Sequence, residues 1–485
     1  MTPDGAFAPR ETRLPPGAGH VAILGAGFAG LTAGSLLAQG GGTVTLIEKD
    51  RTVGGLARTI ERNGFRFDLG GHRFHTENSQ VEALFREALG GDVLEVARSS
   101  KILMNGRYFD YPWQPLDAIR GFGVGTTGSI IFNYAVEQAR RYFRQTEKIS
   151  FEDVIVSRFG RTMFDIFVRE YSEKVWGVEC SRIAPELADW RIPNLSVWAA
   201  VRDALFPRHR GTVRSLIRKF IYPPHGIGQA AEGLRRQIEK NNRVLTGAAV
   251  TAIHHSRGRV DHVAINENGR TRRVKADNFL SSIPLNRLVH LLEPMPPADI
   301  MGAADGLRFR DLVVVATMID RERVTDQSWI YIPEQDIPFG RIHEPTNWSA
   351  RMAPKGKTLL VTEHFCFRGD HVWDAEDDAL ARTTVESLES LGLIGRHEVI
   401  DSLVLRVPDA YPIFEVGYDD DRRRICHYLD TFGNLRVIGR GGMFQYFNMD
   451  HAMESGIAAA EQILAGGASR CAPGREERNL AEAQP

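Results

Sequence analysis

Residues 20–31 read His20-Val-Ala-Ile-Leu-Gly25-Ala-Gly27-Phe-Ala-Gly30-Leu31, an apolar run that breaks into a G-x-G-x-x-G turn. The run before the glycines predicts a buried strand, and the apolar residues after them recur at helical spacing. A second apolar run, Val44–Glu48, follows. This stretch therefore predicts a βαβ unit whose glycine turn binds the pyrophosphate of a dinucleotide.

Each polar or glycine position of this unit has a physical role. Gly25 and Gly27 let backbone N–H groups approach a pyrophosphate, Gly30 lets the helix pack closely on the strand, and the helix N-terminus favours the anion. Glu48 ends the second strand, where an acidic side chain binds ribose hydroxyls. A glycine pair, Gly54-Gly55, follows at once. Backbone that stays accessible over this length favours an extended flavin dinucleotide over NAD.

The composition sets the broad class of the protein. The chain has 485 residues, 43% of them hydrophobic and 25% charged, with a formal net charge of −1, as in ordinary globular proteins. It has no basic block or basic face for nucleic acid or an anionic membrane, and no run near the roughly 20 apolar residues of a membrane span. The four cysteines match no zinc or C-x-x-C spacing, so we expect no metal and reduced thiols in a cytoplasmic protein.

The remaining patterns predict an α/β fold with a discontinuous, Rossmann-like FAD-binding domain. We expect this domain to comprise residues 19–100, 226–300 and 430–466, because a strand, a glycine turn and a helix recur near the C-terminus. A helical insertion is expected at 116–225 and a β-sheet substrate domain at 101–115 plus 301–429. A capping box is expected at Ser150–Asp153, and one strand at Arg243–Ile253. Residues 1–18 and 467–485 are expected to be a flexible arm and a disordered tail.

The order of the motifs resembles one flavoprotein family in particular, the UDP-galactopyranose mutases. More loosely, it resembles the protoporphyrinogen-oxidase and amine-oxidase-like flavoproteins. The similarity covers about residues 20–465. It rests on the glycine turn with Glu48 and Gly54-Gly55, and on Gly71-His-Arg-Phe-His-Thr76, Tyr171-Ser-Glu-Lys-Val-Trp176, Phe339-Gly-Arg341-Ile-His-Glu344, Tyr411-Pro412 and Gly439-Arg-Gly-Gly-Met-Phe-Gln-Tyr446-Phe-Asn-Met-Asp450.

The resemblance implies a flavin-dependent isomerase that interconverts pyranose and furanose forms of a UDP- or GDP-hexose. A reduced flavin would attack the anomeric carbon through N5, forming a flavin–sugar adduct and releasing the nucleoside diphosphate. The sugar ring would then open and close through another hydroxyl. The cycle has no net redox change, so the FAD needs reduction only at the start, by NAD(P)H. We expect a homodimer that binds a nucleotide-diphosphate sugar.

The resemblance and the residue chemistry give the site residues. We expect Arg341 and Arg440 to bind the diphosphate, helped by Tyr411 and Tyr446, because guanidinium groups form charge-assisted bidentate bonds. His75 would lie against the flavin ring. The expected substrate-binding residues are Tyr171, Trp176, Arg191 and Asn448. The expected cofactor-binding residues are Gly25, Gly27, Phe28, Ala29, Gly30, Glu48, Lys49, Gly55, Leu56, Arg58, His72, Val250, Gly439, Arg440, Asn448 and Met449.

Two departures from the mutase pattern leave alternatives open. The mutases carry R-x-P-x-R after the tyrosine and tryptophan, but here Arg191-Ile-Pro-Asn-Leu-Ser196 lacks the last arginine. Either Arg191 takes its role or the diphosphate has one partner fewer. Asn448 replaces an acidic residue, as in the oxidase-like branch. An FAD-dependent oxidase or desaturase therefore stays the alternative function. Several of the site residues could also have structural roles instead, in the hydrophobic core, in surface ion pairs or in a helix cap.

Overall fold

The computed structural model describes residues 19–104, 106–110, 125–126, 128–130, 132–140, 148–191 and 219–466, without the side chains of residues 110 and 191. The expected N-terminal arm and C-terminal tail lie outside the described residues. So do much of the expected helical insertion and the side chain of Arg191. The structure describes three of the cysteines, Cys180, Cys366 and Cys426, which are buried and are not joined by a disulfide bond.

A five-stranded parallel sheet contains the predicted βαβ unit. Its strand order is β20-β13-β1-β2-β9, so the glycine turn after β1 leaves the sheet at a central strand. The strands are β20 (Leu435–Val437), β13 (Asn278–Ser281), β1 (His20–Leu24), β2 (Thr43–Glu48) and β9 (Arg243–Thr246). Because these strands come from three distant parts of the chain, the sheet is assembled discontinuously. The α/β fold class is confirmed.

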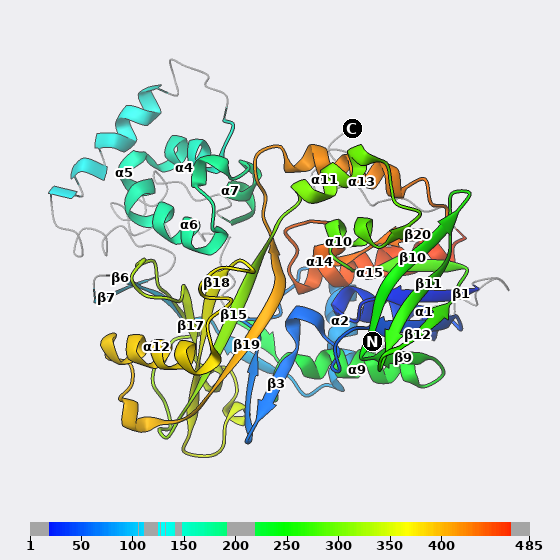
Figure 1. The fold of residues 1–485 in the computed structure, drawn as a ribbon. Coiled ribbons are helices and arrows are strands. Elements are labelled where there is room, and N and C mark those ends of the chain that lie inside the picture. The colour runs from blue at the N-terminus through cyan, green and yellow to red at the C-terminus, as the bar shows by residue number, and fades with distance from the viewer. Residues whose placement is uncertain are drawn as a thin grey trace, which may run out of the picture.

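Three helices pack together beside this sheet. The helix after the glycine turn, α1 (Phe28–Gln39), contacts α15 (Met449–Leu464) and α9 (Gly228–Glu239). The same side of the molecule holds α2 (Ser79–Leu89), whose N-cap Asn78 accepts hydrogen bonds from the N–H groups of Gln80 and Val81. Figure 1 shows α1 and α15 lying alongside β1 at the right.

The prediction of a single strand at Arg243–Ile253 is wrong, because this segment forms two strands that belong to two different sheets. The chain turns at Gly247, whose φ is 68°, a left-handed value that favours glycine. The first half joins the parallel sheet as β9, and the second starts a separate sheet of order β12-β11-β10-β14. Its strands are β10 (Ala248–Ser256), β11 (Arg259–Glu267), β12 (Arg270–Val274) and β14 (Leu292–Glu293).

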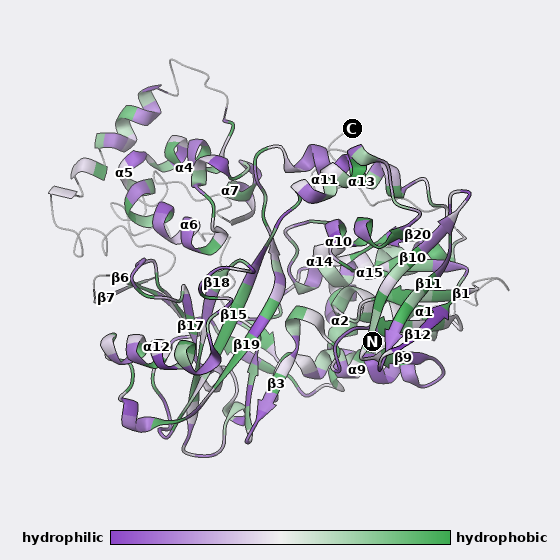
Figure 2. Cartoon of the chain, in the orientation of Figure 1, coloured by the Kyte–Doolittle hydropathy of each residue, from purple (hydrophilic) through white to green (hydrophobic). Residues whose placement is uncertain are grey.

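The second large sheet is mixed and has seven strands in the order β19-β15-β18-β17-β16-β6-β7. Its strands are β19 (Val399–Pro412), β15 (Phe309–Ile319), β18 (Thr358–Cys366), β17 (Arg341–His343), β16 (Trp329–Tyr331), β6 (Ser100–Met104) and β7 (Arg107–Asp110). All eleven residues of β15 are buried, and Figure 2 shows the hydrophobic character of this strand. The helix α12 (Asp377–Ser390) packs on β15 and β19.

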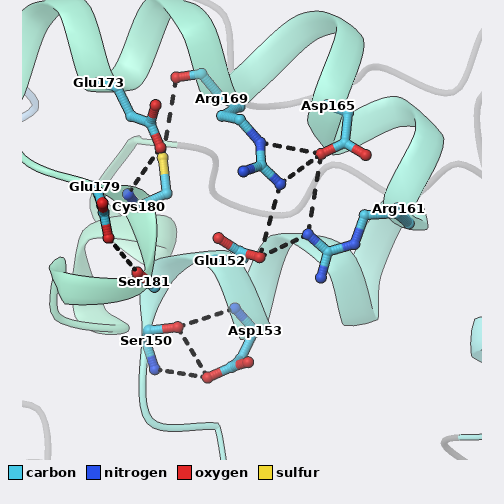
Figure 3. A network of polar contacts seen from close by, with 10 residues as sticks. All are labelled: Ser150, Glu152, Asp153, Arg161, Asp165, Arg169, Glu173, Glu179, Cys180 and Ser181. Atoms are coloured by element: carbon cyan, nitrogen blue, oxygen red, sulfur yellow. Dashed lines mark hydrogen bonds and ion pairs between the residues drawn. The ribbon is translucent and has the colours of Figure 1, made fainter.

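Short helices form a separate layer next to the mixed sheet, at the upper left of Figure 1. They are α4 (Phe151–Phe159), α5 (Arg161–Phe164), a π-helical turn (Asp165–Arg169), α6 (Glu170–Trp176) and α7 (Glu186–Arg191). The predicted capping box is confirmed, because Ser150 and Asp153 exchange both hydrogen bonds at the start of α4. Figure 3 shows two ion pairs of this layer: Arg161 of α5 contacts Glu152 of α4 at 2.6 Å, and Arg169 contacts Asp165 within the π-helical turn at 2.7 Å.

The remaining elements connect these layers. They are β3 (Thr59–Arg62), β4 (Phe65–Asp68), β5 (Leu94–Ala97), β8 (Lys219–Tyr222), α10 (Leu285–His290), α11 (Ala298–Gly306), α13 (Tyr418–Leu429) and α14 (Gly439–Gly442). In the part of the chain that the structure describes, no helix is long and apolar enough to cross a membrane.

Candidate active site

A cavity of about 1080 Å³ extends from the glycine turn to the mixed sheet. Its volume is at the upper end of small-molecule sites in proteins. The predicted site residues that line it are Gly25, Gly27, Phe28, Ala29, Glu48, Lys49, Gly55, Leu56, Arg58, His72, His75, Val250, Arg341, Gly439, Arg440, Tyr446, Asn448 and Met449. Gly30, Tyr171, Trp176 and Tyr411 lie outside the lining set.

The glycine turn is shaped for close approach by a ligand. A Cβ on Gly30 would lie 2.1 Å from the carbonyl oxygen of Gly25, so α1 packs directly on the turn and Gly30 does not face the cavity. A Cβ on Gly27 would meet nothing within 4 Å, so that backbone faces open space at the start of α1. Open backbone at a helix N-terminus fits a pyrophosphate.

The second glycine pair lies against the first turn. Gly54 N–H donates to the carbonyl oxygen of Ala26 at 2.8 Å, and a Cβ on Gly55 would lie 3.1 Å from Gly27 Cα. Arg58 follows and pairs with Asp50 at 2.7 Å. The loop after β1 and the loop after β2 therefore contact each other and together line the cavity, which fits an extended dinucleotide.

Glu48 lies at the end of β2 and is held by backbone amides. Its two carboxylate oxygens accept hydrogen bonds from Ala26 N at 2.8 Å and Asp50 N at 2.9 Å. Burial raises the pKa of the Glu48 carboxyl, and the two amides oppose that rise. The amides fix the orientation of the carboxylate while its remaining lone pairs stay available to a ribose.

Two guanidinium groups and a tyrosine meet where the mixed sheet faces the cavity. Arg341 Nη2 donates to the hydroxyl of Tyr411 at 3.1 Å and lies 3.3 Å from Glu363 Oε2. The guanidinium of Arg440, on α14, lies 4.7 Å from the centre of the Tyr411 ring. Burial opposes the charge on Arg341, but the Glu363 carboxylate and nearby tyrosines keep the pKa of Arg341 well above its usual value. Arg341 therefore stays cationic.

Arg440 also contacts a second aromatic ring, that of Tyr446. Its guanidinium lies 5.8 Å from the centre of the Tyr446 ring, and Tyr446 stacks on Trp190 of α7 at 6.0 Å. The N–H of Gly439, which precedes Arg440, donates to Ser455 Oγ at 2.9 Å, so α14 is tied to α15. Cations over aromatic faces are stabilised by the ring quadrupole. This geometry fixes Arg440 in the cavity wall.

The two predicted histidines differ in their surroundings. His75 is exposed and lines the cavity. His72 lies deeper, and burial together with the charges of Arg440 and Arg341 lowers its pKa to about 4. At neutral pH, His72 is therefore a neutral imidazole that has both arginines as neighbours.

Tyr171 and Trp176 support the wall from behind. The Trp176 ring is 3% exposed and packs edge-on against Tyr411 at 6.2 Å, and Tyr171 packs edge-on against the cavity residue Tyr331 at 5.5 Å. Arg310 of β15 donates to the carbonyl oxygen of Val175 at 3.2 Å, which holds the end of α6 on the sheet.

Sequence reasoning missed several residues of the wall. Tyr331, Trp329, His343, Glu363 and Trp190 all line the cavity. Side chains alternate between the two faces of a strand, so Tyr331 and Trp329 share one face of β16, and Arg341 and His343 share one face of β17. With Arg341 taken as a site residue, this alternation is a signal that could have found Trp329, Tyr331 and His343. Glu363 could have been added by taking β18 as the neighbour of β17. Trp190 carried no such signal.

Comparison with known proteins decides the family. The family model for flavin-containing amine oxidoreductases matches residues 28–464. The chain belongs to this family. Membership in the flavin-containing amine oxidoreductases supports FAD as the cofactor of the cavity described above.

The proteins to which this chain is similar are named for different activities. Coproporphyrinogen III oxidase of Mycobacterium leprae is 24% identical over 421 residues, which are 82% of this chain and 88% of that protein. A "Probable UDP-galactopyranose mutase" of Klebsiella pneumoniae is 25% identical over 173 residues, 34% of this chain and 42% of that protein. A solved structure of reduced UDP-galactopyranose mutase superposes with a TM-score of 0.80 at 21% identity, covering 93% of this chain and 94% of the other. This last likeness concerns the fold.

Proposed function

We propose that this flavoprotein is a nucleotide-diphosphate-sugar mutase that interconverts pyranose and furanose forms. The observation that carries the proposal is the pair of guanidinium side chains, Arg341 and Arg440, which line the same cavity as the dinucleotide turn and both contact Tyr411 behind its wall. A diphosphate leaving group needs fixed positive charge and bidentate donors, and guanidinium groups supply both.

The chain's own residues would divide the work as follows. FAD, when bound and reduced, supplies the electron pair that the anomeric carbon needs, without net redox change, and NAD(P)H is the proposed reductant. Arg341 and Arg440 bind the diphosphate as it leaves, and the Tyr411 hydroxyl keeps Arg341 in place. Tyr446 and Trp190 cover the sugar and exclude water. His72, being neutral, offers one donor and one acceptor without competing with the arginines for phosphate.

A second candidate is an FAD-dependent oxidase, favoured by the similarity to coproporphyrinogen III oxidase over most of both chains. In that case the arginines would bind carboxylates of the substrate, and the reaction would consume an electron acceptor. The two candidates differ in the flavin state that supports turnover and in whether a nucleotide is needed.

The deciding experiment compares dithionite-reduced and oxidised FAD-loaded protein on UDP- and GDP-hexoses, with separation of pyranose from furanose products. The mutase predicts conversion only with reduced flavin and no oxygen uptake. No conversion in either state would overturn it, and oxygen uptake with a porphyrinogen would establish the oxidase.

Variants test the diphosphate site by itself. Arg341→Ala and Arg440→Ala are expected to keep bound FAD but to lose affinity for nucleoside diphosphates by about tenfold or more. Arg272→Ala is the matched control, because Arg272 is half-exposed on β12 and lies outside the cavity lining. Normal affinity in both test variants would contradict the proposal.

A further inference from the structure

A carboxylate held between two arginines lies in another part of the cavity wall. Asp409 of β19 contacts Arg287 of α10, whose Nη2 lies 2.9 Å from Asp409 Oδ2 and 3.2 Å from Oδ1. Arg368, in the loop after β18, donates to the same carboxylate. All three residues, which we call the Asp409 cluster, line the cavity. Because α10 follows β13 of the parallel sheet while β18 and β19 belong to the mixed sheet, the cluster joins the two halves of the fold.

The Asp409 cluster lies near the position where we expect the dinucleotide ribose. Burial raises the pKa of the Asp409 carboxyl, and the charges of Arg287, Arg368 and Lys49 oppose that rise. A charge shifts the pKa of a carboxyl mainly from close by, so Lys49 is a neighbour of Asp409. Lys49 directly follows Glu48, the residue expected to bind the ribose, and both line the cavity. The cluster therefore lies toward the adenosine half of the proposed FAD site.

This part of the cavity wall reaches the surface of the protein. The side chains of Arg287 and Arg368 are 37% and 43% exposed, whereas that of Asp409 is 10% exposed. The ion pairs thus have solvent on one side and the cavity on the other. A dinucleotide that passes between solvent and the cavity at this place has to separate the two halves of the cluster.

The backbone at Asp409 is shaped to present its carboxylate here. The register between β15 and β19 shifts at Asp311, so residues 408–410 of β19 lie opposite this single residue of β15. Within this bulge Asp409 has a φ of 55°, a left-handed value that is uncommon outside glycine. Bulges re-aim side chains and are frequent next to functional sites. The irregularity in β19 therefore serves to direct Asp409 rather than to continue the ladder.

The buried carboxylate of Asp311 holds the mixed-sheet side of the cluster. Asp311 is 4% exposed, and its Oδ1 accepts a hydrogen bond from Asp409 N at 2.7 Å. Its Oδ2 accepts one from Arg368 N at 2.9 Å. Asp409 and Arg368 are thus fixed to β15 without any help from Arg287. Arg287 is the partner from the other half of the fold, and it can leave Asp409 without undoing the bulge.

We propose that the ion pair between Arg287 and Asp409 is a clasp that opens to let FAD enter or leave the cavity. Asp311 and Arg368 keep the Asp409 carboxylate in place on the mixed sheet, and Arg287 closes onto it from α10. Partly exposed ion pairs usually add little to stability, so the effect of this one is on the rates of cofactor exchange. The clasp concerns retention of the cofactor and is independent of the reaction that the flavin carries out.

The test measures how fast FAD leaves and enters the full-length protein. Release is followed by absorbance while bound FAD exchanges for an excess of 5-deaza-FAD, and association by FAD fluorescence after mixing with apoprotein. Asp409→Asn removes the charge, and asparagine tolerates a left-handed backbone. Both rates are expected to rise about five- to tenfold, as loss of one ion pair in the closed state would give. The dissociation constant should then change much less than either rate.

Further variants assign the effect to this ion pair. Arg287→Gln should raise both rates as much as Asp409→Asn, and the double variant should be no faster, because the two residues act through one contact. Asp401→Asn is the matched control. Asp401 lies on the same strand and pairs with Arg62 of β3 at 2.9 Å, and neither residue lines the cavity. Its exchange rates should equal those of the parent.

Three outcomes would overturn the clasp. The first is parental rates in both Arg287→Gln and Asp409→Asn. The second is faster release with an unchanged association rate, since the residues would then stabilise bound FAD without controlling its passage. The third is equal acceleration in Asp401→Asn, which would indicate general loosening of β19. Thermal melts of the apoproteins verify folding, and Arg287→Gln decides alone if Asp409→Asn does not fold.

Discussion

Arg341 and Glu363 face each other across β17 and β18, with Arg341 Nη2 3.3 Å from Glu363 Oε2. The carboxylate is 1% exposed. Burial raises the pKa of the Glu363 carboxyl, while the Arg341 charge and the Gly71 amide oppose the rise. The ion pair thus fixes one guanidinium in the cavity wall and cancels part of its charge.

Glu363→Gln tests this balance. Glutamine keeps the shape but removes the negative charge, so Arg341 should attract a diphosphate more strongly, by about three- to tenfold in dissociation constant. The melting temperature should fall, because removing one partner of a buried ion pair leaves an uncompensated charge and costs up to about 3–5 kcal/mol. Calorimetry with UDP and GDP and a thermal melt give both values. Unchanged affinity would mean that the diphosphate binds away from Arg341.

Tyr411 is expected to act in two separable ways. Tyr411→Phe keeps the ring under Arg440 but loses the hydroxyl at 3.1 Å from Arg341, so we expect about a fivefold loss of nucleoside-diphosphate affinity. Tyr411→Leu also loses the ring and should bind more weakly still. Titration of both variants checks the order, and equal affinities in the two would show that the ring contributes nothing.

Local rules made much of the local structure around the glycine turn and at the start of α4 predictable. The glycine turn, Glu48 and the Ser150 capping box depend on residues close in sequence, whose spacing fixes a turn, a strand end or a helix start. The fold class followed from the same unit. The split of Arg243–Ile253 was missed because a single glycine, Gly247, redirects the chain from one sheet to another.

The wall of the cavity was harder to predict, because strand pairing between distant segments creates it. Glu363 faces Arg341 only through the β17–β18 register, and Trp329 meets Arg73 and Arg98 only after three separate segments converge. A single sequence carries the alternation within each strand but not the register between strands. The roles assigned to all of the site residues, in cofactor binding as well as in catalysis and substrate binding, stay predictions, and the side chain of Arg191 lies outside the described residues.

Gly27 and Gly30 form a matched pair of tests for the dinucleotide turn. A Cβ on Gly27 meets no protein atom within 4 Å, so Gly27→Ala should fold normally but bind FAD more weakly, because its methyl group fills space next to the pyrophosphate. A Cβ on Gly30 would lie 2.1 Å from Gly25 O, so Gly30→Ala should destabilise the apoprotein by about 1–3 kcal/mol. Thermal melts of the apoproteins and FAD titrations separate the effects. Full FAD affinity in Gly27→Ala would place the pyrophosphate elsewhere.

Arg310 is expected to position the helix that carries Tyr171 and Trp176. Its side chain is 7% exposed and donates to Val175 O at 3.2 Å and to Phe365 O at 2.9 Å. Arg310→Met should lower the melting temperature and weaken sugar-nucleotide binding while FAD content stays normal. Arg308→Met is the control, because Arg308 is a more exposed arginine two residues away. Normal sugar-nucleotide affinity in Arg310→Met would mean that α6 does not shape the substrate site.

Asp68 should make stability depend on pH below neutrality. Its carboxylate, fully buried, accepts hydrogen bonds from Tyr222 OH at 2.5 Å, Thr59 Oγ1 at 2.6 Å and Ile227 N at 3.2 Å. Burial raises its pKa from 3.8 to about 7, which these hydrogen bonds only partly offset. Since the folded state holds the proton more tightly, the stabilisation is complete below the unfolded pKa and is lost as the pH rises through about 7.

Asp68→Asn removes this titration while keeping the size of the side chain. The unfolding free energy of the parent, measured relative to the variant, should fall by about 1.4 kcal/mol for each pH unit between about 4 and 7 and then level off. Paired thermal melts from pH 5 to 8 measure the difference, and the variant controls for every other titrating group. A difference that stays constant over this range would mean that Asp68 is ionised throughout, with its three donors outweighing its burial.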